Sequence, residues 1–182
     1  HAIENGKKIG VTALTGVAAL LLNCNATTIH TWAGIGLCRK ENNLIIKSVI
    51  KSKYKLHNWL NTDILIIDEI SMMSDKMFEI LDSIGRKVLY KNKPFGGIQI
   101  IFSGDFFQLP PVSETVFCFE NENFLKYFTS IYALNEIYRQ NDTIYKKILN
   151  NLRVGKITKK SINKLKSKLI KNININLDDN TT

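Results

Sequence analysis

Two adjacent carboxylates follow directly on the most apolar segment of the chain. Asp68 and Glu69 come after four consecutive apolar residues, Ile64 to Ile67, with no turn residue between them. A carboxylate at the end of a buried strand can hold Mg²⁺ through its water shell, and a neighbouring carboxylate can orient or deprotonate an attacking water. The pair therefore fits a phosphoryl-transfer site, with Asp68 on the metal and Glu69 on the water. The alternative is that both carboxylates only favour the positive start of the following helix.

Two further side chains could contact the same phosphates. The apolar segment IQIIF (residues 98–102) also ends on polar residues, within the string SGDFFQLPPV, and Gln108 lies on this proline-stiffened loop. Glutamines in other NTPases hydrogen-bond a γ-phosphate or its attacking water. Arg139, just past a further expected strand, suits stabilisation of charge on a transferring phosphoryl group, although alone it fits a surface ion pair equally well. Of Phe106 and Phe107, at least one is expected to be a core anchor.

Strands alternate with helices along the chain, which is typical of a doubly wound α/β domain. The segments at 63–67 and 98–102 are runs rich in branched apolar residues, so we expect strands buried on both faces in a parallel sheet covered by helices. The opening string HAIENGKK fits the last turn of a helix closed by Asn5-Gly6. The structure of residues 39–60 stays open, since their pattern is only weakly helical. Further strands are expected at 9–13 and 130–134, and helices from Thr15-Gly16 to about Asn23, within 27–36, after Ser74, from about 144 to 155 and around 162–169.

The expected sheet places the polar strand ends together. In parallel sheets of this kind, ligands bind beyond the carboxyl ends of the strands. We therefore expect Asp68, Glu69, Asp105 and Gln108 to lie along one crevice. The two carboxylates would then point into a site.

The length, hydrophobic content and net charge of the chain are those of an ordinary domain with a basic surface. The chain has 182 residues, 45% of them hydrophobic, which is enough for a buried core. Its net charge of +9 and pI of about 9.4 suit a polyanionic partner or, equally, a solvated basic surface. The lysines from Lys146 to Lys171 are interpreted mainly as such a solvated face, with contacts to backbone phosphate as the alternative.

Three cysteines, Cys24, Cys38 and Cys118, form no C-x-x-C pair, which indicates free thiols in a reducing compartment. A zinc site with His30 or His57 has little support from the spacing. No apolar run approaches the roughly 20 residues that span a bilayer, and no signal-peptide pattern opens the chain. We therefore expect a soluble intracellular protein with no membrane partner.

Five motifs in a fixed order resemble one family of motor proteins. TALTGVAALLL, TIHTWAGIG, LIIDEISMM, PFGGIQIIFSGDFFQLPPV and NEIYRQND are similar to the motor segments of the Pif-type ("petite integration frequency") DNA helicases, a superfamily-one family related to the bacterial RecD helicases. The string SMMSDKMFEILDSIGRKVLYKNKPFGG resembles the family's signature element. The resemblance implies a RecA-like P-loop NTPase fold and an ATP- and Mg²⁺-dependent motor. Such a motor moves 5′ to 3′ along single-stranded DNA and unwinds duplexes, forks and often G-quadruplexes in DNA repair, recombination or telomere maintenance, in the nucleus or mitochondrion of a eukaryote.

The resemblance also assigns roles to individual residues. Asp68 and Glu69 match the family's metal-binding and water-activating carboxylates, and Gln108 matches its γ-phosphate-sensing glutamine. Arg139 matches an arginine that reaches the same phosphate. For Trp32, stacking on a DNA base would contribute about 1–3 kcal/mol, and core packing is the slightly favoured alternative. The remaining matches are Gly104 and Asp105 on the nucleotide side, Thr12, Thr15 and Gly16 in the first DNA-contacting motif, and His30, Thr31 and Trp32 in the next.

The sequence departs from the family at the phosphate-binding loop. No G-x-x-x-x-G-K-[ST] string occurs, so the phosphate-cradling loop and its lysine are absent. We expect a fragment in which residues 1–157 form a partial first motor domain without its first strand and P-loop. Residues 158–182 would form a basic helix and an asparagine-rich tail leading to a second motor domain. Such a segment alone is predicted to show no measurable ATPase or unwinding activity.

An incomplete sheet also predicts poor stability. In the family's strand order, the missing strand lies between those expected at 98–102 and 130–134, so leaving it out would expose two edges and favour aggregation. Two other interpretations stay open: a non-catalytic nucleic-acid-binding remnant of a helicase, and the helicase region of a mobile element.

Overall fold

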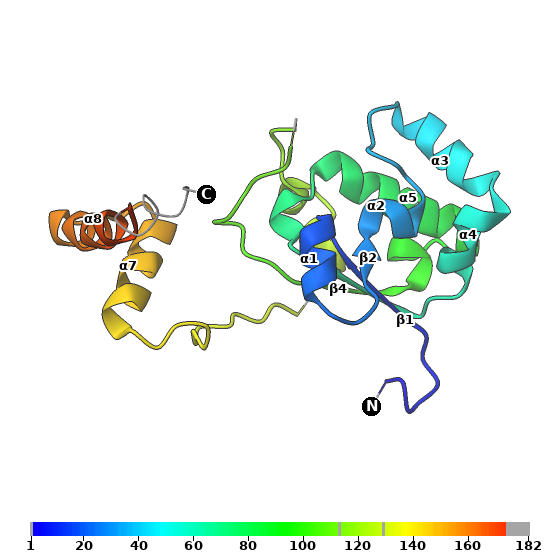
Figure 1. Ribbon diagram of the computed structural model, residues 1–182. Coiled ribbons are helices and arrows are strands. Elements are labelled where there is room, and N and C mark those ends of the chain that lie inside the picture. The colour runs from blue at the N-terminus through cyan, green and yellow to red at the C-terminus, as the bar shows by residue number, and fades with distance from the viewer. Residues whose placement is uncertain (1, 113, 129, 174–182) are drawn as a thin grey trace, which may run out of the picture. The chain divides into compact units, whose positions relative to one another are not determined.

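The chain divides into two compact units (Figure 1). The computed structural model describes residues 2–112, 114–128 and 130–173, so the expected asparagine-rich tail lies mostly outside the described residues. Unit 1 extends to Ile131 and contains the sheet, and unit 2 starts at Tyr132 and contains two helices. The predicted domain boundary at residue 157 stays a prediction. Among the described residues, none of the helices combines the length and apolar character needed to cross a bilayer.

A four-stranded parallel sheet forms the centre of unit 1, in the order β2-β1-β3-β4. In the register of the sheet, Asp68 pairs with Ala13 on one side, and Ile67 pairs with Phe102 on the other. A parallel sheet flanked by helices confirms the predicted α/β class, and the strand predicted at 9–13 is confirmed. The strands are β1 (Ile9–Ala13), β2 (Thr27–Thr28), β3 (Ile64–Asp68) and β4 (Gln99–Phe102).

Helices form most of the remaining structure. The segment left open at 39–60 forms two helices, α3 and α4, which lie beside α5 (Figure 1). The first residues form a turn closed by Gly6, with φ +72°, rather than an assigned helical turn. The helices are α1 (Gly16–Leu21), α2 (Ile29–Ala33), α3 (Asn42–Ile50), α4 (Lys53–Leu60), α5 (Asp75–Leu89), α6 (Phe124–Tyr127), α7 (Thr143–Arg153) and α8 (Lys159–Ile173), with 3-10 turns η1 (Ile70–Met72), η2 (Pro94–Gly97) and η3 (Cys118–Glu120).

Helix α5 supplies much of the core that supports the sheet. It begins at Ser74, whose hydroxyl accepts a hydrogen bond from the Met77 amide at 3.2 Å, as an N-cap does. Its apolar residues recur at helical spacing and face inward, as predicted. Its Gly85 lies so close to η2 that a Cβ there would be 2.5 Å from the carbonyl of Phe95. The buried apolar residues of α5 are Met77, Phe78, Ile80, Leu81, Ile84 and Val88.

Burial of the sheet is one-sided, which corrects the expectation for both central apolar strands. In β3, Leu65 and Ile67 are buried, whereas Ile66 on the other face is only half-buried. In β4, Ile101 is 43% exposed and Gln99 is also exposed. β4 is an edge strand, so it lacks the second neighbour that would cover these side chains.

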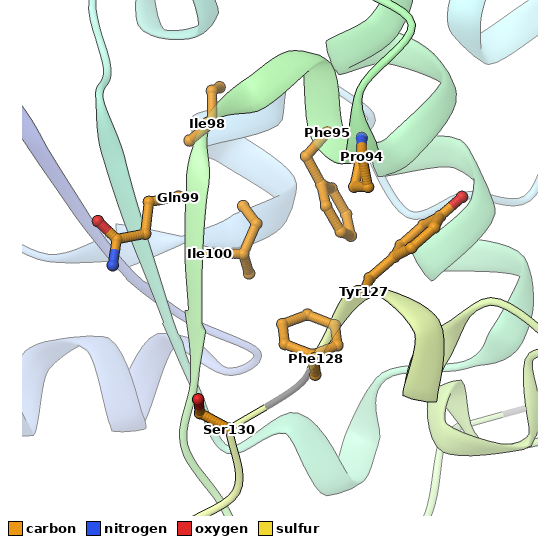
Figure 2. A pocket seen from close by; sticks show the side chains of 8 residues that line it. All are labelled: Pro94, Phe95, Ile98, Gln99, Ile100, Tyr127, Phe128 and Ser130. Carbon is orange, nitrogen blue, oxygen red and sulfur yellow. The ribbon is translucent and has the colours of Figure 1, made fainter.

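The strand predicted at 130–134 is wrong. No strand is assigned to these residues, and Ile131 and Leu134 are 73% and 96% exposed. A strand needs a neighbouring backbone to satisfy its N–H and C=O groups, and no described strand pairs with the outer edge of β4. Beside that edge, Phe95, Tyr127 and Phe128 instead line an open pocket of about 340 Å³ (Figure 2).

Candidate nucleotide and DNA site

The carboxylate pair lies at the carboxyl end of β3, as predicted. Asp68 is the last residue of the strand, and its carbonyl accepts a hydrogen bond from the Leu14 amide at 3.1 Å. Glu69 has a left-handed backbone, with φ 58° and ψ 41°. This conformation is uncommon outside glycine, costs on the order of 1–3 kcal/mol, and is concentrated at functional sites. Both side chains are half-buried, so neither is sealed in the core.

The loop after β4 is in backbone contact with this carboxylate turn. The Ser103 amide donates to the Ile67 carbonyl at 3.0 Å, and the Ile70 amide donates to the Ser103 carbonyl at 3.1 Å. At Gly104 a Cβ would be 2.8 Å from the Ile70 nitrogen, closer than real Cβ atoms come. Glycine at 104 therefore lets the two loops approach. The expected adjacency of the two strand ends is present.

Gln108 is presented by a tight turn in this second loop. The Asp105 side chain accepts from the Phe107 amide at 3.1 Å, and the Asp105 carbonyl accepts from the Gln108 amide at 2.9 Å. The amide nitrogen of the Gln108 side chain lies 3.5 Å from the Asp105 carboxylate. Asp105 is half-buried and Gln108 is exposed. The turn thus fixes the start of the Gln108 side chain while leaving its end available to a ligand.

An aromatic cluster that the sequence reasoning missed supports both loops. Phe106 packs edge-on against Phe119, with ring centroids 4.7 Å apart, and confirms that one of the two adjacent phenylalanines is an anchor. Phe107 is 63% exposed. The segment carrying Phe119 is itself tied to the carboxylate turn, because the Cys118 amide donates to the Met73 carbonyl at 3.0 Å. The dense aromatic string VFCF (residues 116–119) was the available signal.

The carboxylates at this site fit a metal ion whose remaining ligands are water and substrate phosphate. Among the described residues, no group of three or more His, Cys, Asp and Glu side chains is arranged to hold a metal. Mg²⁺ needs no such cage, because it is bound through one or two carboxylates together with waters and substrate phosphates. A single half-buried carboxylate at Asp68 is therefore compatible with a magnesium nucleotide and poorly suited to a structural metal.

A model of the PIF1-like helicase family matches residues 2–163, most of the chain. The chain belongs to this family. The ATP-dependent DNA helicase PIF1 of Saccharomyces cerevisiae is 40% identical over 161 residues, which are 85% of this chain and 18% of that protein. This chain spans about a fifth of the length of the curated relatives it matches.

Solved structures of PIF1-like helicases have the same RecA-like fold, which confirms that part of the prediction. The crystal structure of Pif1 helicase from Candida albicans has a TM-score of 0.80 and 37% identity, covering 88% of this chain and 36% of that one. Pif1 helicase from Bacteroides, in complex with ADP-AlF3 and ssDNA, has a TM-score of 0.72 and 33% identity, covering 87% of this chain and 39% of that one.

In this member of the PIF1-like family, the first motif predicted to contact DNA is only partly accessible. Thr12 is completely buried, and its hydroxyl donates to the Ile66 carbonyl at 2.9 Å. Its side chain is therefore unavailable to DNA, which corrects that expectation. Thr15 caps α1 by accepting from the Ala18 amide at 3.1 Å. Gly16 is exposed, and a Cβ there would meet nothing within 4 Å.

The residues of the second motif predicted to contact DNA also differ in their exposure. Trp32 is 7% exposed and lies against Trp59, with ring centroids 5.0 Å apart, so it packs in the core and cannot stack on a base in this conformation. Thr31 is exposed and shares a hydrogen bond of 2.9 Å with Thr28. His30 is half-buried, and this burial lowers its pKa, so its neutral form is favoured. It lines a groove of about 480 Å³ whose other members include Leu37, Arg39, Lys76 and Val112.

Arg139 belongs to unit 2, whereas the strand-end residues belong to unit 1. Its side chain is exposed. The predicted contact between Arg139 and a phosphate therefore stays a prediction.

Proposed function

We propose that the protein containing this chain is an ATP-dependent DNA helicase, and that the chain is part of its first motor domain. The motor would translocate 5′ to 3′ on single-stranded DNA and unwind duplexes and forks, inside the cell where DNA is maintained. Membership of the PIF1-like family supports this activity. The observation that carries the assignment of the site is the backbone contact between the loops after β3 and β4, which brings Asp68 and Glu69 beside the loop of Gln108.

On the hydrolytic side, each residue has a separate task. Asp68 would hold Mg²⁺, and Glu69 would orient or deprotonate the attacking water. Gln108 hydrogen-bonds the terminal phosphate or that water, while Gly104 and Asp105 shape the loop that presents it. Arg139 stabilises the charge that develops on the transferring group. The bound magnesium nucleotide supplies the phosphoryl group and the charge that polarises it.

On the DNA side, the members of the two motifs that are not fully buried make the contacts. Thr15, Gly16 and Thr31 would contact backbone phosphates through hydroxyl and amide groups, which position a strand without reading its sequence. His30 contributes from its groove as a neutral hydrogen-bonding side chain. Thr12 and Trp32 are buried and would act indirectly, Thr12 through its hydrogen bond to the Ile66 carbonyl and Trp32 through its packing against Trp59.

The test is the substitution Glu69→Gln in the full-length protein. Loss of a general base reduces turnover by about 10²–10⁴-fold, so ATPase activity stimulated by single-stranded DNA should fall below about 1% of the wild-type rate, with DNA affinity retained. Glu79→Gln on the exposed face of α5 is the matched control and should leave turnover unchanged. Normal turnover in the Glu69→Gln protein would overturn the assignment of Glu69.

A further inference from the structure

The net positive charge of the chain comes from one segment. Ten lysine and arginine residues and no aspartate or glutamate lie between Thr143 and Ile173. The rest of the chain carries the other 15 lysine and arginine residues against all 16 acidic ones. The segment from Thr143 to Ile173 therefore accounts for the whole net charge of +9.

This segment contains the two helices of unit 2, α7 and α8, joined by a short turn (orange to red in Figure 1). Asp142 caps α7 by accepting from the Ile144 and Tyr145 amides at 2.8 and 3.0 Å. Gly155, with φ +70°, ends the turn after α7, and the Thr158 hydroxyl accepts from the Ser161 amide at 3.2 Å at the start of α8. Both helices therefore have defined starts.

A groove of about 740 Å³ runs between these two helices. Three lysines line it: Lys147 from α7, and Lys160 and Lys164 from α8. All three are exposed, and the two on α8 are four residues apart and share one face. Like charges this close repel, so the arrangement favours an anion between them. The same groove contains neutral hydrogen-bonding groups, from Thr143, Asn151, Thr158 and Ser161.

We propose that this groove binds the phosphate backbone of a nucleic acid. Phosphates are contacted by lysines together with hydroxyl and amide side chains, and these groups line the groove beside the apolar Ile144 and Ile148. An extended polyanion can contact all three lysines of the groove at once, whereas a small anion needs only one or two. An acidic protein segment has the same sign of charge, but a motor that acts on DNA supplies the polyanion directly. The proposal thus adds a DNA contact outside the family motifs.

The experiment measures how the affinity of the full-length protein for DNA depends on salt, without nucleotide. The variant Lys147→Gln/Lys160→Gln/Lys164→Gln removes three charges and keeps the length of the side chains. Each phosphate contact contributes about 0.7 to the slope of log K against log [salt] on single strands and about 0.9 on duplexes. The slope should therefore become shallower by about 2 on a single strand or about 2.7 on a duplex, and the two substrates show which one the groove holds.

Two control variants make the result specific. Lys47→Gln/Lys51→Gln/Lys53→Gln removes three exposed lysines around the α3–α4 junction and should leave the slope unchanged. The arginine variant Lys147→Arg/Lys160→Arg/Lys164→Arg keeps the charge and should keep the wild-type slope. An unchanged slope in the glutamine variant overturns the proposal, and so does a loss of affinity that arginine fails to restore. Because nucleotide is absent, neither outcome depends on the assignment of Asp68 or Glu69.

Discussion

The contact between the two strand-end loops predicts a severe effect of Gly104→Ala. The added Cβ would lie 2.8 Å from the Ile70 nitrogen and 3.1 Å from the Ile70 Cγ1. The first neighbour is backbone, so the clash can be relieved only by moving the turn that carries Glu69 or the loop that carries Gln108. Overpacking of this kind costs about 1–3 kcal/mol.

The same displacement should reduce catalysis more than substrate binding. A misplacement of about 1 Å can lower a rate on the order of 10²-fold when catalytic groups must be held in a fixed geometry. We therefore expect Gly104→Ala to lower kcat by about 10- to 100-fold with a smaller change in KM. Steady-state ATPase assays on the full-length protein measure the rate, and urea unfolding measures the stability.

Gly16→Ala is the matched control, because a Cβ at this position meets nothing within 4 Å. Gly16 also begins a helix, where alanine is preferred to glycine. The control should unfold at the same urea concentration as the wild type or slightly above it, because the added methyl group meets no other atom. If Gly104→Ala showed wild-type stability and wild-type kcat, close approach of the two loops could not be what holds the site together.

Two further predictions concern groups that stabilise the support of the site. Burial raises the pKa of the Cys118 thiol to about 12, so alkylation at pH 8 followed by mass spectrometry should label the exposed Cys24 and leave Cys118 unmodified in the folded protein. Rapid labelling of Cys118 at pH 8 would contradict its burial. Because the same thiol ionises near 9.0 in the unfolded chain, the free energy of unfolding should fall as the pH rises above 9.0. Asp82 accepts hydrogen bonds from the Phe95 amide at 2.6 Å and from the Arg86 Nε at 2.8 Å. Asp82→Ala should therefore lower the free energy of unfolding, measured in urea, by about 1–3 kcal/mol. An unchanged midpoint of urea unfolding would show that these hydrogen bonds contribute nothing to stability.

The local sequence pattern was sufficient to predict a helix that has its own capping residue and a regular apolar spacing. Helix α5 has a serine cap and apolar residues at helical spacing, and both are present in the structure. Helices α3 and α4 gave weaker signals, because each is short and they are separated by a break at Ser52. They form through long-range burial, since Val49 and Trp59 are completely buried against the rest of unit 1. Tertiary contacts of this kind are not visible in a local window.

The candidate site was predictable in its placement and less so in its details. Two apolar strands with polar ends imply neighbouring carboxyl termini in a parallel sheet, and that adjacency holds for Glu69 and Gly104. The left-handed backbone of Glu69 has no sequence signal, because this conformation is uncommon for glutamate. Motif similarity also groups Thr12 with Gly16, although one is buried and the other exposed. A motif identifies related positions, and the fold decides which of them reach a ligand.

The errors at β4 and at residues 130–134 have one physical origin. A run of branched apolar residues shows that a segment is able to be buried on both faces, but a second strand and a covering helix must lie beside it for that burial to occur. On the same face of the sheet, Ile66 of β3 has strands on both sides and is half-buried, whereas its partner Ile101 of β4 has a neighbour on one side and is 43% exposed. The two segments have nearly the same composition. Their different burial therefore comes from their neighbours in the sheet, which lie far away in the sequence.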